Sequence, residues 1–170
     1  TLFSNYPVEM IKVSPTLEQQ ALNAMRRFER VARRNILLEK VWKKEAGNSY
    51  RIGQARITFL SGAPESNIVG ATASGLLEVD EAQEVTLLKY DRDISPMTAS
   101  VCATRAFWGT AWTASTLLGR ELRAARAAEA RDGVQRVFLL TAEDVAKEVN
   151  AYRKHVEERV ALLGRTHPLV

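Results

Sequence analysis

The chain has 170 residues, 46% of them hydrophobic, and this length suffices for one substantial domain. Lys and Arg outnumber Asp and Glu by 24 to 20, so the formal net charge of +4 is only mildly basic. We expect a cytoplasmic protein, because no apolar run is long enough to span a membrane and the first residues lack a signal-peptide pattern. The single cysteine, Cys102, leaves no partner for an internal disulfide, and no Cys/His cluster has the spacing of a zinc site.

Segments with strand and helix periodicity alternate along the chain. Strands are expected at residues 8–13, 55–60, 76–79, 103–108 and 134–140. Helices are expected at residues 16–32, 113–132 and 141–160. Residues 35–48 are predicted to be a helix end and a polar loop, residues 90–97 a loop, and residues 82–90 a helix or turn. Such alternation is typical of βα units, so we predict an α/β fold with a mostly parallel sheet.

Local signals refine the helix starts. Thr16 with Gln19 forms a capping-box pattern, and Thr141 opens the last helix together with Asp144. The helix at 113–132 is expected to be capped by Thr113 or Ser115. The two tryptophans just before that helix, Trp108 and Trp112, are expected to belong to the core.

Two adjacent carboxylates follow the apolar strand at residues 76–79. Asp80 and Glu81 lie at its carboxyl end, while Gly109 and Thr110 follow the strand at 103–108. Ligands of open parallel sheets bind at the carboxyl ends of the strands. An apolar strand ending in Asp-Glu suits a nucleotide triphosphatase, in which the first carboxylate holds Mg²⁺ and the second orients the attacking water.

Three stretches, "FLSGAPESNIVGATASGLLEVDEAQEV", "KYDRDISPM" and "FWGTAW", resemble the ATPase domain of phage large terminase subunits, the motors that package DNA into procapsids. The resemblance implies that Asp80 is the Walker B aspartate and binds Mg²⁺, that Glu81 is the catalytic glutamate, and that Gly109 and Thr110 belong to the coupling motif that senses ATP. It further implies ATP and Mg²⁺ as cofactors. The implied partners are double-stranded DNA, the portal and the small terminase subunit, in the cytoplasm of a bacterial host of a phage or prophage.

The chain also departs from that family. It contains no G-x-x-x-x-G-K-[ST] phosphate-binding loop and no nuclease domain with clustered carboxylates. We therefore expect residues 1–170 to be one partial ATPase domain, a P-loop NTPase (RecA-like) core that lacks its first βα unit. Such a chain should be inactive alone, and the sheet edge exposed by the missing strand favours a homo-oligomer.

Two other interpretations remain open. One is a helicase-type ATPase fragment, because "DEAQ" is also a helicase-type motif, although no arginine-bearing helicase motif follows. The other is a non-catalytic module that binds DNA or a partner through basic residues. These residues are Arg26, Arg27, Arg30, Arg33, Arg34, Lys40, Lys43 and Lys44. The simplest explanation of this basic segment is a solvated helix face.

Overall fold

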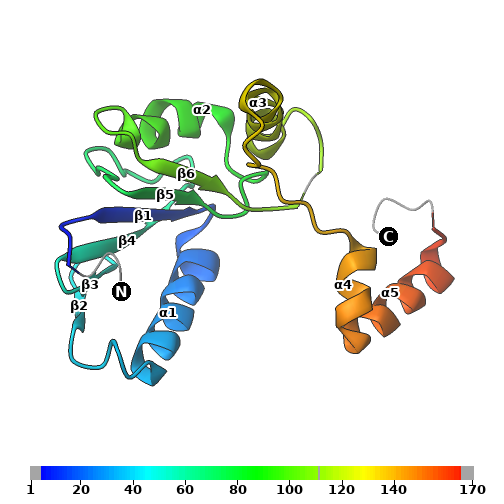
Figure 1. Ribbon diagram of the computed structural model, residues 1–170, viewed down its shortest axis with the longest axis horizontal. Coiled ribbons are helices and arrows are strands. Elements are labelled where there is room, and N and C mark those ends of the chain that lie inside the picture. The colour runs from blue at the N-terminus through cyan, green and yellow to red at the C-terminus, as the bar shows by residue number, and fades with distance from the viewer. Residues whose placement is uncertain (1–4, 111, 166–170) are drawn as a thin grey trace. The chain divides into compact units, whose positions relative to one another are not determined.

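The computed structural model describes residues 5–110 and 112–165. Its central feature is a six-stranded sheet in the order β2-β3-β4-β1-β5-β6 (Figure 1). Neighbouring strands from β4 to β6 are parallel, and β3 is antiparallel to both of its neighbours, β2 and β4. The strands are β1 (Glu9–Ser14), β2 (Trp42–Glu45), β3 (Ser49–Ile52), β4 (Ala55–Ser61), β5 (Leu76–Val79) and β6 (Thr104–Phe107). The predicted α/β fold with a mostly parallel sheet is confirmed.

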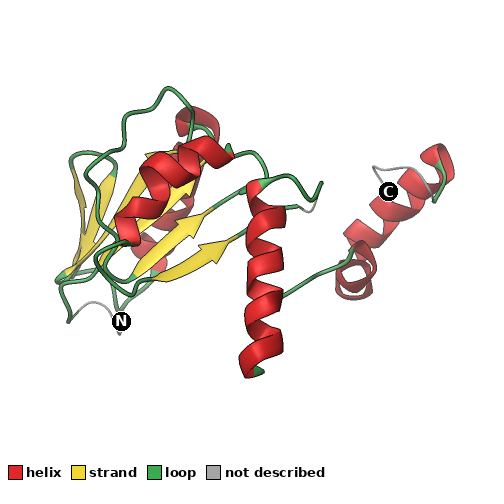
Figure 2. Cartoon of the chain, turned by 90° about the horizontal axis from the view of Figure 1, so that it is seen from above, coloured by secondary structure: helices red, strands yellow, loops and turns green. Residues whose placement is uncertain are grey.

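In the first 124 residues, helices flank the sheet, and Figure 2 shows the strands lying side by side with helices over them. The helical elements are η1 (Leu17–Ala21), α1 (Leu22–Arg34), α2 (Leu87–Lys89), η2 (Tyr90–Ile94), η3 (Ser95–Thr98), α3 (Leu117–Asp132), α4 (Ala142–Glu148) and α5 (Asn150–Leu163). Among the described residues, no helix has the length and apolar character that a membrane span requires.

Each face of the sheet has its own core. Alternation along a strand sends Ile11 and Val13 of β1 to one face, where they join Leu77 and Val79 of β5 in a cluster with η2, η3 and the start of α3. On the opposite face, Met25, Tyr50 and Phe59 form a second cluster under α1. The register pairs Lys12 with Phe59, so Lys12 lies on the α1 face.

The first helix begins differently from the prediction. η1 is a π-helical turn, in which the N–H of Ala21 donates to the carbonyl of Thr16 at 3.1 Å. This wider turn places Gln20 at the helix start instead of Gln19. The Oε1 atom of Gln20 accepts hydrogen bonds from the backbone N–H of Thr16 at 3.0 Å and from its hydroxyl at 3.2 Å. The capping box of Thr16 with Gln19 is therefore wrong.

The loop predicted at residues 35–48 is also wrong, because it contains β2 and the turn into β3. Gly47 and Asn48 both have positive φ angles, 70° and 58°, which the tight turn of the β2–β3 hairpin requires. The charged strand β2 is held by ion pairs as well as by backbone bonds. Glu45 accepts from Arg51 at 2.6 Å and from Arg56 at 3.0 Å.

Residues 90–97, predicted as a loop, are helical in η2 and the start of η3. An ion pair between Lys89 and Asp93, four residues apart, spans one helical turn here, and Pro96 lies in the first turn of η3. The prediction that Thr113 or Ser115 caps α3 is wrong. Instead, the hydroxyl of Thr116 accepts from the N–H of Gly119 at 3.1 Å.

The chain divides into two compact units, residues 1–124 and 125–170. In the second unit the strand predicted at 134–140 is wrong, because a strand exists only through bonds to a neighbour and no described strand pairs with this segment. The predicted capping box of Thr141 and Asp144 is confirmed. The single predicted helix is two, since Val149 has an extended backbone between α4 and α5.

Candidate functional site

The turns that follow β5 and β6 lie side by side, at the carboxyl-terminal edge of the sheet where the sequence places both. β5 and β6 are adjacent and pair Val79 with Phe107. The ladder continues past the strands, because the N–H of Trp108 donates to the carbonyl of Val79 at 2.9 Å and the N–H of Ala82 donates to the carbonyl of Trp108 at 2.8 Å. Asp80 and Glu81 therefore share one edge of the sheet with Gly109 and Thr110.

Asp80 is half-exposed and paired with a lysine of the neighbouring strand. Its Oδ2 atom lies 3.1 Å from Nζ of Lys12, and its side chain is 36% exposed. Lys12 also binds Glu78, which lies two residues before Asp80 and so on the same face of β5. One ammonium group thus contacts two carboxylates, so the three side chains together keep one negative charge.

The pKa of Lys12 records this environment. Burial lowers it, but the hydrogen bonds and charges of Glu78 and Asp80 outweigh burial and hold the pKa above its ordinary value. Lys12 is therefore a fixed positive charge beside the carboxylate of Asp80. The sequence offers a signal for this pair. Lys12 is a charged residue inside an apolar strand, and a buried charge needs a partner such as Glu78 in a neighbouring strand.

Glu81 has a left-handed backbone, with φ of 45°, which is uncommon for a residue with a side chain. Adjacent residues of a regular strand point in opposite directions, so this conformation re-aims the chain directly after Asp80. The carboxylate of Glu81 accepts a hydrogen bond at 2.6 Å from Nε2 of Gln83. Sequence reasoning missed Gln83, whose side chain is buried at 7% exposure.

Gln83 also reaches the turn after β6. Its Oε1 atom accepts from the backbone N–H of Thr110 at 3.2 Å. Gly109 makes this approach possible, because a Cβ atom at that position would lie 1.9 Å from Oε1 of Gln83. The glycine of the predicted coupling motif therefore has a packing role at this edge.

The oxygen atoms at this edge suit Mg²⁺, which prefers hard oxygen ligands and is usually held by one or two carboxylates together with water and substrate phosphates. Asp80 supplies a half-exposed carboxylate, of which only Oδ2 contacts Lys12. Among the described residues no group of three or more His, Cys, Asp or Glu side chains could hold a metal ion. The residues present thus fit Mg²⁺ that arrives with a phosphate ligand and do not form a cage for a free ion.

The tryptophans beside this edge are not part of the core. Trp108 is 57% exposed and Trp112 is 61% exposed, so the prediction of core positions is wrong. Alternation along β6 explains Trp108, because Phe107 points into the core under η2 and its successor must face the other side.

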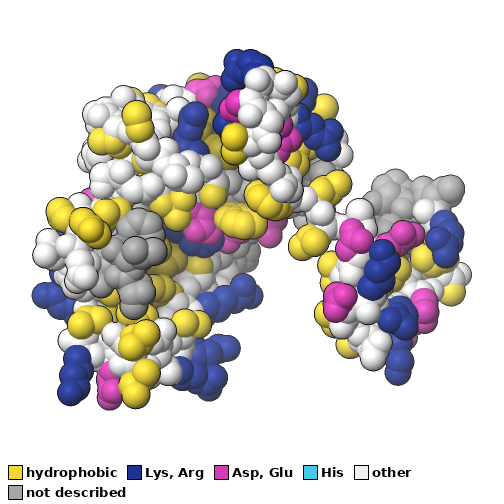
Figure 3. All heavy atoms as spheres, in the orientation of Figure 1, with side chains coloured by type: hydrophobic (Ala, Val, Ile, Leu, Met, Phe, Trp, Pro, Cys, Tyr) yellow, Lys and Arg dark blue, Asp and Glu magenta, His cyan; other side chains and the backbone are white. Residues whose placement is uncertain are grey.

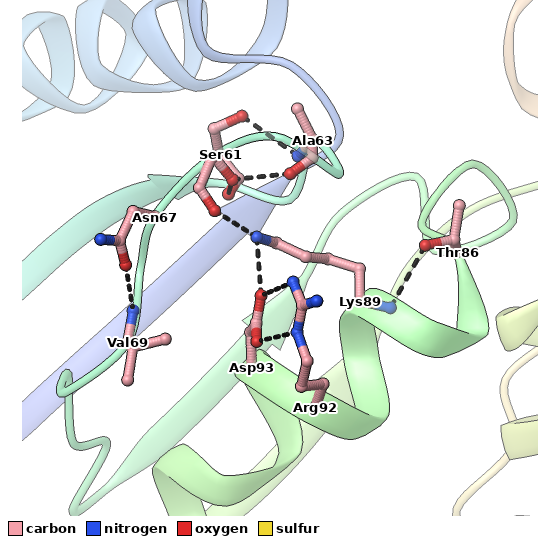
Figure 4. Close-up of polar contacts among 9 residues, drawn as sticks. Ser61, Ala63, Asn67, Val69, Thr86, Lys89, Arg92 and Asp93 are labelled. Carbon is pink, nitrogen blue, oxygen red and sulfur yellow. Dashed lines mark hydrogen bonds and ion pairs between the residues drawn. The ribbon is translucent and has the colours of Figure 1, made fainter.

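A second polar cluster lies on the other side of the sheet, behind the site. Nζ of Lys89 pairs with Oδ2 of Asp93 at 2.8 Å and donates to the backbone carbonyl of Ser66, while Arg92 binds both oxygens of Asp93 at 2.6 and 2.9 Å (Figure 4). The hydroxyl of Ser66 donates to the carbonyl of Ser61 at 2.7 Å. This cluster fastens the loop that follows β4 to the helices after β5.

Comparisons with known proteins identify the fold. The chain matches the ATPase domain of the Thermus phage P74-26 large terminase, with a TM-score of 0.53 and 16% identity over 65% of this chain and 51% of that chain. A point mutant of that domain matches equally well. The HK97 bacteriophage large terminase matches with a TM-score of 0.60 and 14% identity over 72% of this chain and 26% of that chain.

No protein-family model matches the chain, and a search of curated proteins finds no match. The chain spans about half of the P74-26 domain that it matches. At 14–16% identity the comparisons show the fold alone: the sheet and its flanking helices are similar to those of the large terminase structures.

Proposed function

We propose that the chain is a fragment of a DNA-packaging terminase ATPase and carries its Walker B and coupling motifs. The observation that supports this proposal is the shared edge of β5 and β6, where the Asp80-Glu81 pair lies beside the Gly109-Thr110 turn in a sheet of the terminase ATPase fold. The activity, its coupling to DNA movement and its cofactors ATP and Mg²⁺ belong to this proposal.

Each residue has a separate role in the proposed reaction. Asp80 would anchor Mg²⁺, and the ion, when bound, would offset the negative charge of the phosphates. Glu81 orients the water that attacks the γ-phosphate, and its left-handed backbone re-aims the chain directly after Asp80. Thr110 contacts the γ-phosphate and relays its loss to the DNA-translocating surface.

The proposal also specifies what the 170 residues lack. They contain no G-x-x-x-x-G-K-[ST] loop, whose backbone N–H groups and lysine supply much of the affinity for a triphosphate. We expect this chain to bind ATP-Mg²⁺ no better than about millimolar. Calorimetry on the purified chain tests this directly, and magnesium-dependent binding in the micromolar range would contradict the proposal.

The roles of Asp80 and Thr110 are tested in a version of the protein that also carries a P-loop segment. Asp80→Ala should weaken magnesium-dependent ATP binding and hydrolysis together, because the ion loses the carboxylate that anchors it. Thr110→Ala should leave binding near the parental level while reducing the DNA movement obtained for each ATP hydrolysed. Equal effects of the two variants on binding would contradict the assigned roles.

Duplex DNA is the proposed partner, and α1 offers a basic face for it. Arg26, Arg30, Arg33 and Arg34 recur at helical spacing and are all exposed, whereas Met25 and Ala32 of the same helix are buried. Figure 3 shows Lys and Arg side chains in dark blue on this face of the molecule. Among the described residues, ion pairs on this face involve only Glu29, which lies 3.9 Å from Arg33 and 2.9 Å from Lys44. Most of these cations are thus available to phosphates.

A further inference from the structure

Gln83 uses both ends of its buried amide to join the two turns of the site. Its Nε2 donates to Oε2 of Glu81 at 2.6 Å, and its Oε1 accepts from the N–H of Thr110 at 3.2 Å. A carboxylate can only accept and a backbone N–H can only donate, so these partners fix which end of the amide faces which turn. Only one orientation of Gln83 satisfies both.

The two bonds differ in strength. The bond to Glu81 is short and assisted by the negative charge of the carboxylate, whereas the bond from Thr110 is neutral and near the long limit for N–H···O. The link from Thr110 is therefore the one that breaks first when the turn after β6 moves. Gly109 leaves the space in which this weaker bond forms, because a Cβ atom there would overlap Oε1 of Gln83.

We propose that Gln83 is a positioning residue that anchors the carboxylate of Glu81 to the turn at Gly109-Thr110. While the bond from Thr110 is made, the amide of Gln83 is fixed and holds the carboxylate in one place. When that turn shifts, the amide loses its anchor and Glu81 loses its fixed position. The catalytic meaning of this link rests on the proposed function, since Glu81 is there the residue that orients water.

Amide hydrogen exchange and NMR on the 170-residue chain test the link without any activity. Gln83→Leu keeps the size and burial of the side chain but removes both bonds. We expect the N–H of Thr110 to exchange about 3- to 10-fold faster in this variant. We also expect Glu81→Gln to shift the amide signal of Thr110 in the parental chain and to leave it unchanged in the Gln83→Leu background.

Gln20 provides a matched control, because its Oε1 also accepts from a backbone N–H, that of Thr16 at 3.0 Å. Gln20→Leu should accelerate exchange at Thr16 and leave Thr110 unaffected. If Thr110 exchanges at the parental rate in Gln83→Leu, or if Glu81→Gln shifts its signal equally in both backgrounds, Gln83 does not join the turns and the inference is wrong.

A second variant serves if Gln83→Leu does not fold. Gln83→Met keeps an unbranched side chain of similar length, but it cannot donate to Glu81 and its sulfur accepts only weakly from Thr110. Exchange at Thr110 should again be faster than in the parental chain, and the response of its signal to Glu81→Gln should disappear. A response that persists in Gln83→Met would overturn the proposal.

The catalytic consequence is measured in a version that carries a P-loop segment. Gln83→Leu should lower kcat about 10- to 100-fold, the scale for a misplaced catalytic group, with KM for ATP within about twofold. A parental protein that does not hydrolyse ATP would contradict the proposed function and leave the exchange results standing. Unchanged kcat in Gln83→Leu, with the link at Thr110 lost, would make Gln83 a structural residue only.

Discussion

Two lysine-carboxylate clusters lie close to the same sheet and differ in how completely they are satisfied. In the cluster of Lys89 and Asp93 the side chains are 1% and 4% exposed, and Asp93 is bound on both oxygens. In the cluster of Lys12, Glu78 and Asp80 the side chains are 15%, 25% and 36% exposed. Exposure rises toward Asp80, at the edge of the sheet.

The difference shows which charges maintain the fold and which are free to bind a ligand. A buried charge is stable only when it is paired and hydrogen-bonded, so the cluster of Lys89 tolerates no rearrangement. Asp80 has one oxygen beside Lys12 and remains accessible to solvent, so an ion or a phosphate can approach it. Disrupting the cluster of Lys89 should therefore destabilise the protein most, and removing fully exposed charges should hardly affect its stability.

Asp93→Ala should have the largest effect. Its removal leaves the ammonium group of Lys89 buried without its counter-charge. Stranding one partner of a buried ion pair costs about 3–5 kcal/mol of unfolding free energy. Urea denaturation measures the loss, and Asp91→Ala is the control, because Asp91 is 55% exposed where it pairs with Arg120. Equal stability of the two variants would contradict the difference between the buried ion pair of Asp93 and the exposed ion pair of Asp91.

The cluster of Lys89 and Asp93 should also make the stability of the protein depend on pH in the acid range. Hydrogen bonds from Arg92 and then Lys89 hold the pKa of Asp93 well below its ordinary value of 3.8, against the effect of burial. The folded state then binds fewer protons than the unfolded state, so this stabilisation is complete above about pH 4 and is lost as the pH falls through the lower folded pKa. Denaturation between pH 7 and pH 2 should show this loss in the parental chain, and Asp93→Asn should lack that part of it.

Lys12→Met should have an intermediate effect, with a drop of about 1–2 kcal/mol in the unfolding free energy. It leaves Glu78 and Asp80 as neighbouring anions, so millimolar Mg²⁺ should raise the melting temperature of the variant more than that of the parent. Lys44→Met is the control, since Lys44 is 59% exposed in its pair with Glu29. An equal response to Mg²⁺ in parent and variant would show that Asp80 does not attract the ion.

The basic face of α1 should have the smallest effect on stability. Replacing Arg30, Arg33 and Arg34 by Ala should change the unfolding free energy by no more than about 0.5 kcal/mol, because all three are exposed. Binding to duplex DNA should nevertheless weaken, and the slope of log K against log salt should fall by about one for each arginine that contacts a phosphate. Unchanged binding would make this face a solvated helix surface.

The sequence predicts the apolar strands well and the charged ones badly. β1, β4, β5 and β6 begin and end within one residue of the prediction, because an apolar core selects those segments. β2, with the sequence WKKE, has no such signal and forms through its antiparallel partner and the ion pairs of Glu45. Residues 134–140 show the opposite case. Their apolar pattern predicts a strand, but among the described residues no strand pairs with them.

The candidate site follows the same rule. The carboxyl ends of parallel strands share one edge of a sheet, so the sequence places Asp80 and Glu81 at the same edge as Gly109 and Thr110. The structure adds that β5 and β6 are neighbours. Gln83 could not, because its role depends on a left-handed residue at Glu81 and on the missing side chain at Gly109. The chemical roles of these residues stay predictions.

The most direct test of the central claim is the rate of ATP hydrolysis by Glu81→Gln, measured beside equilibrium ATP binding in a version of the protein that carries a P-loop segment. The variant keeps the size of the side chain and removes the charge that orients water. Hydrolysis should fall by about 10²- to 10⁴-fold while ATP binding survives. Hydrolysis at the parental rate would show that Glu81 is only a carboxylate at a turn and would contradict the proposed mechanism.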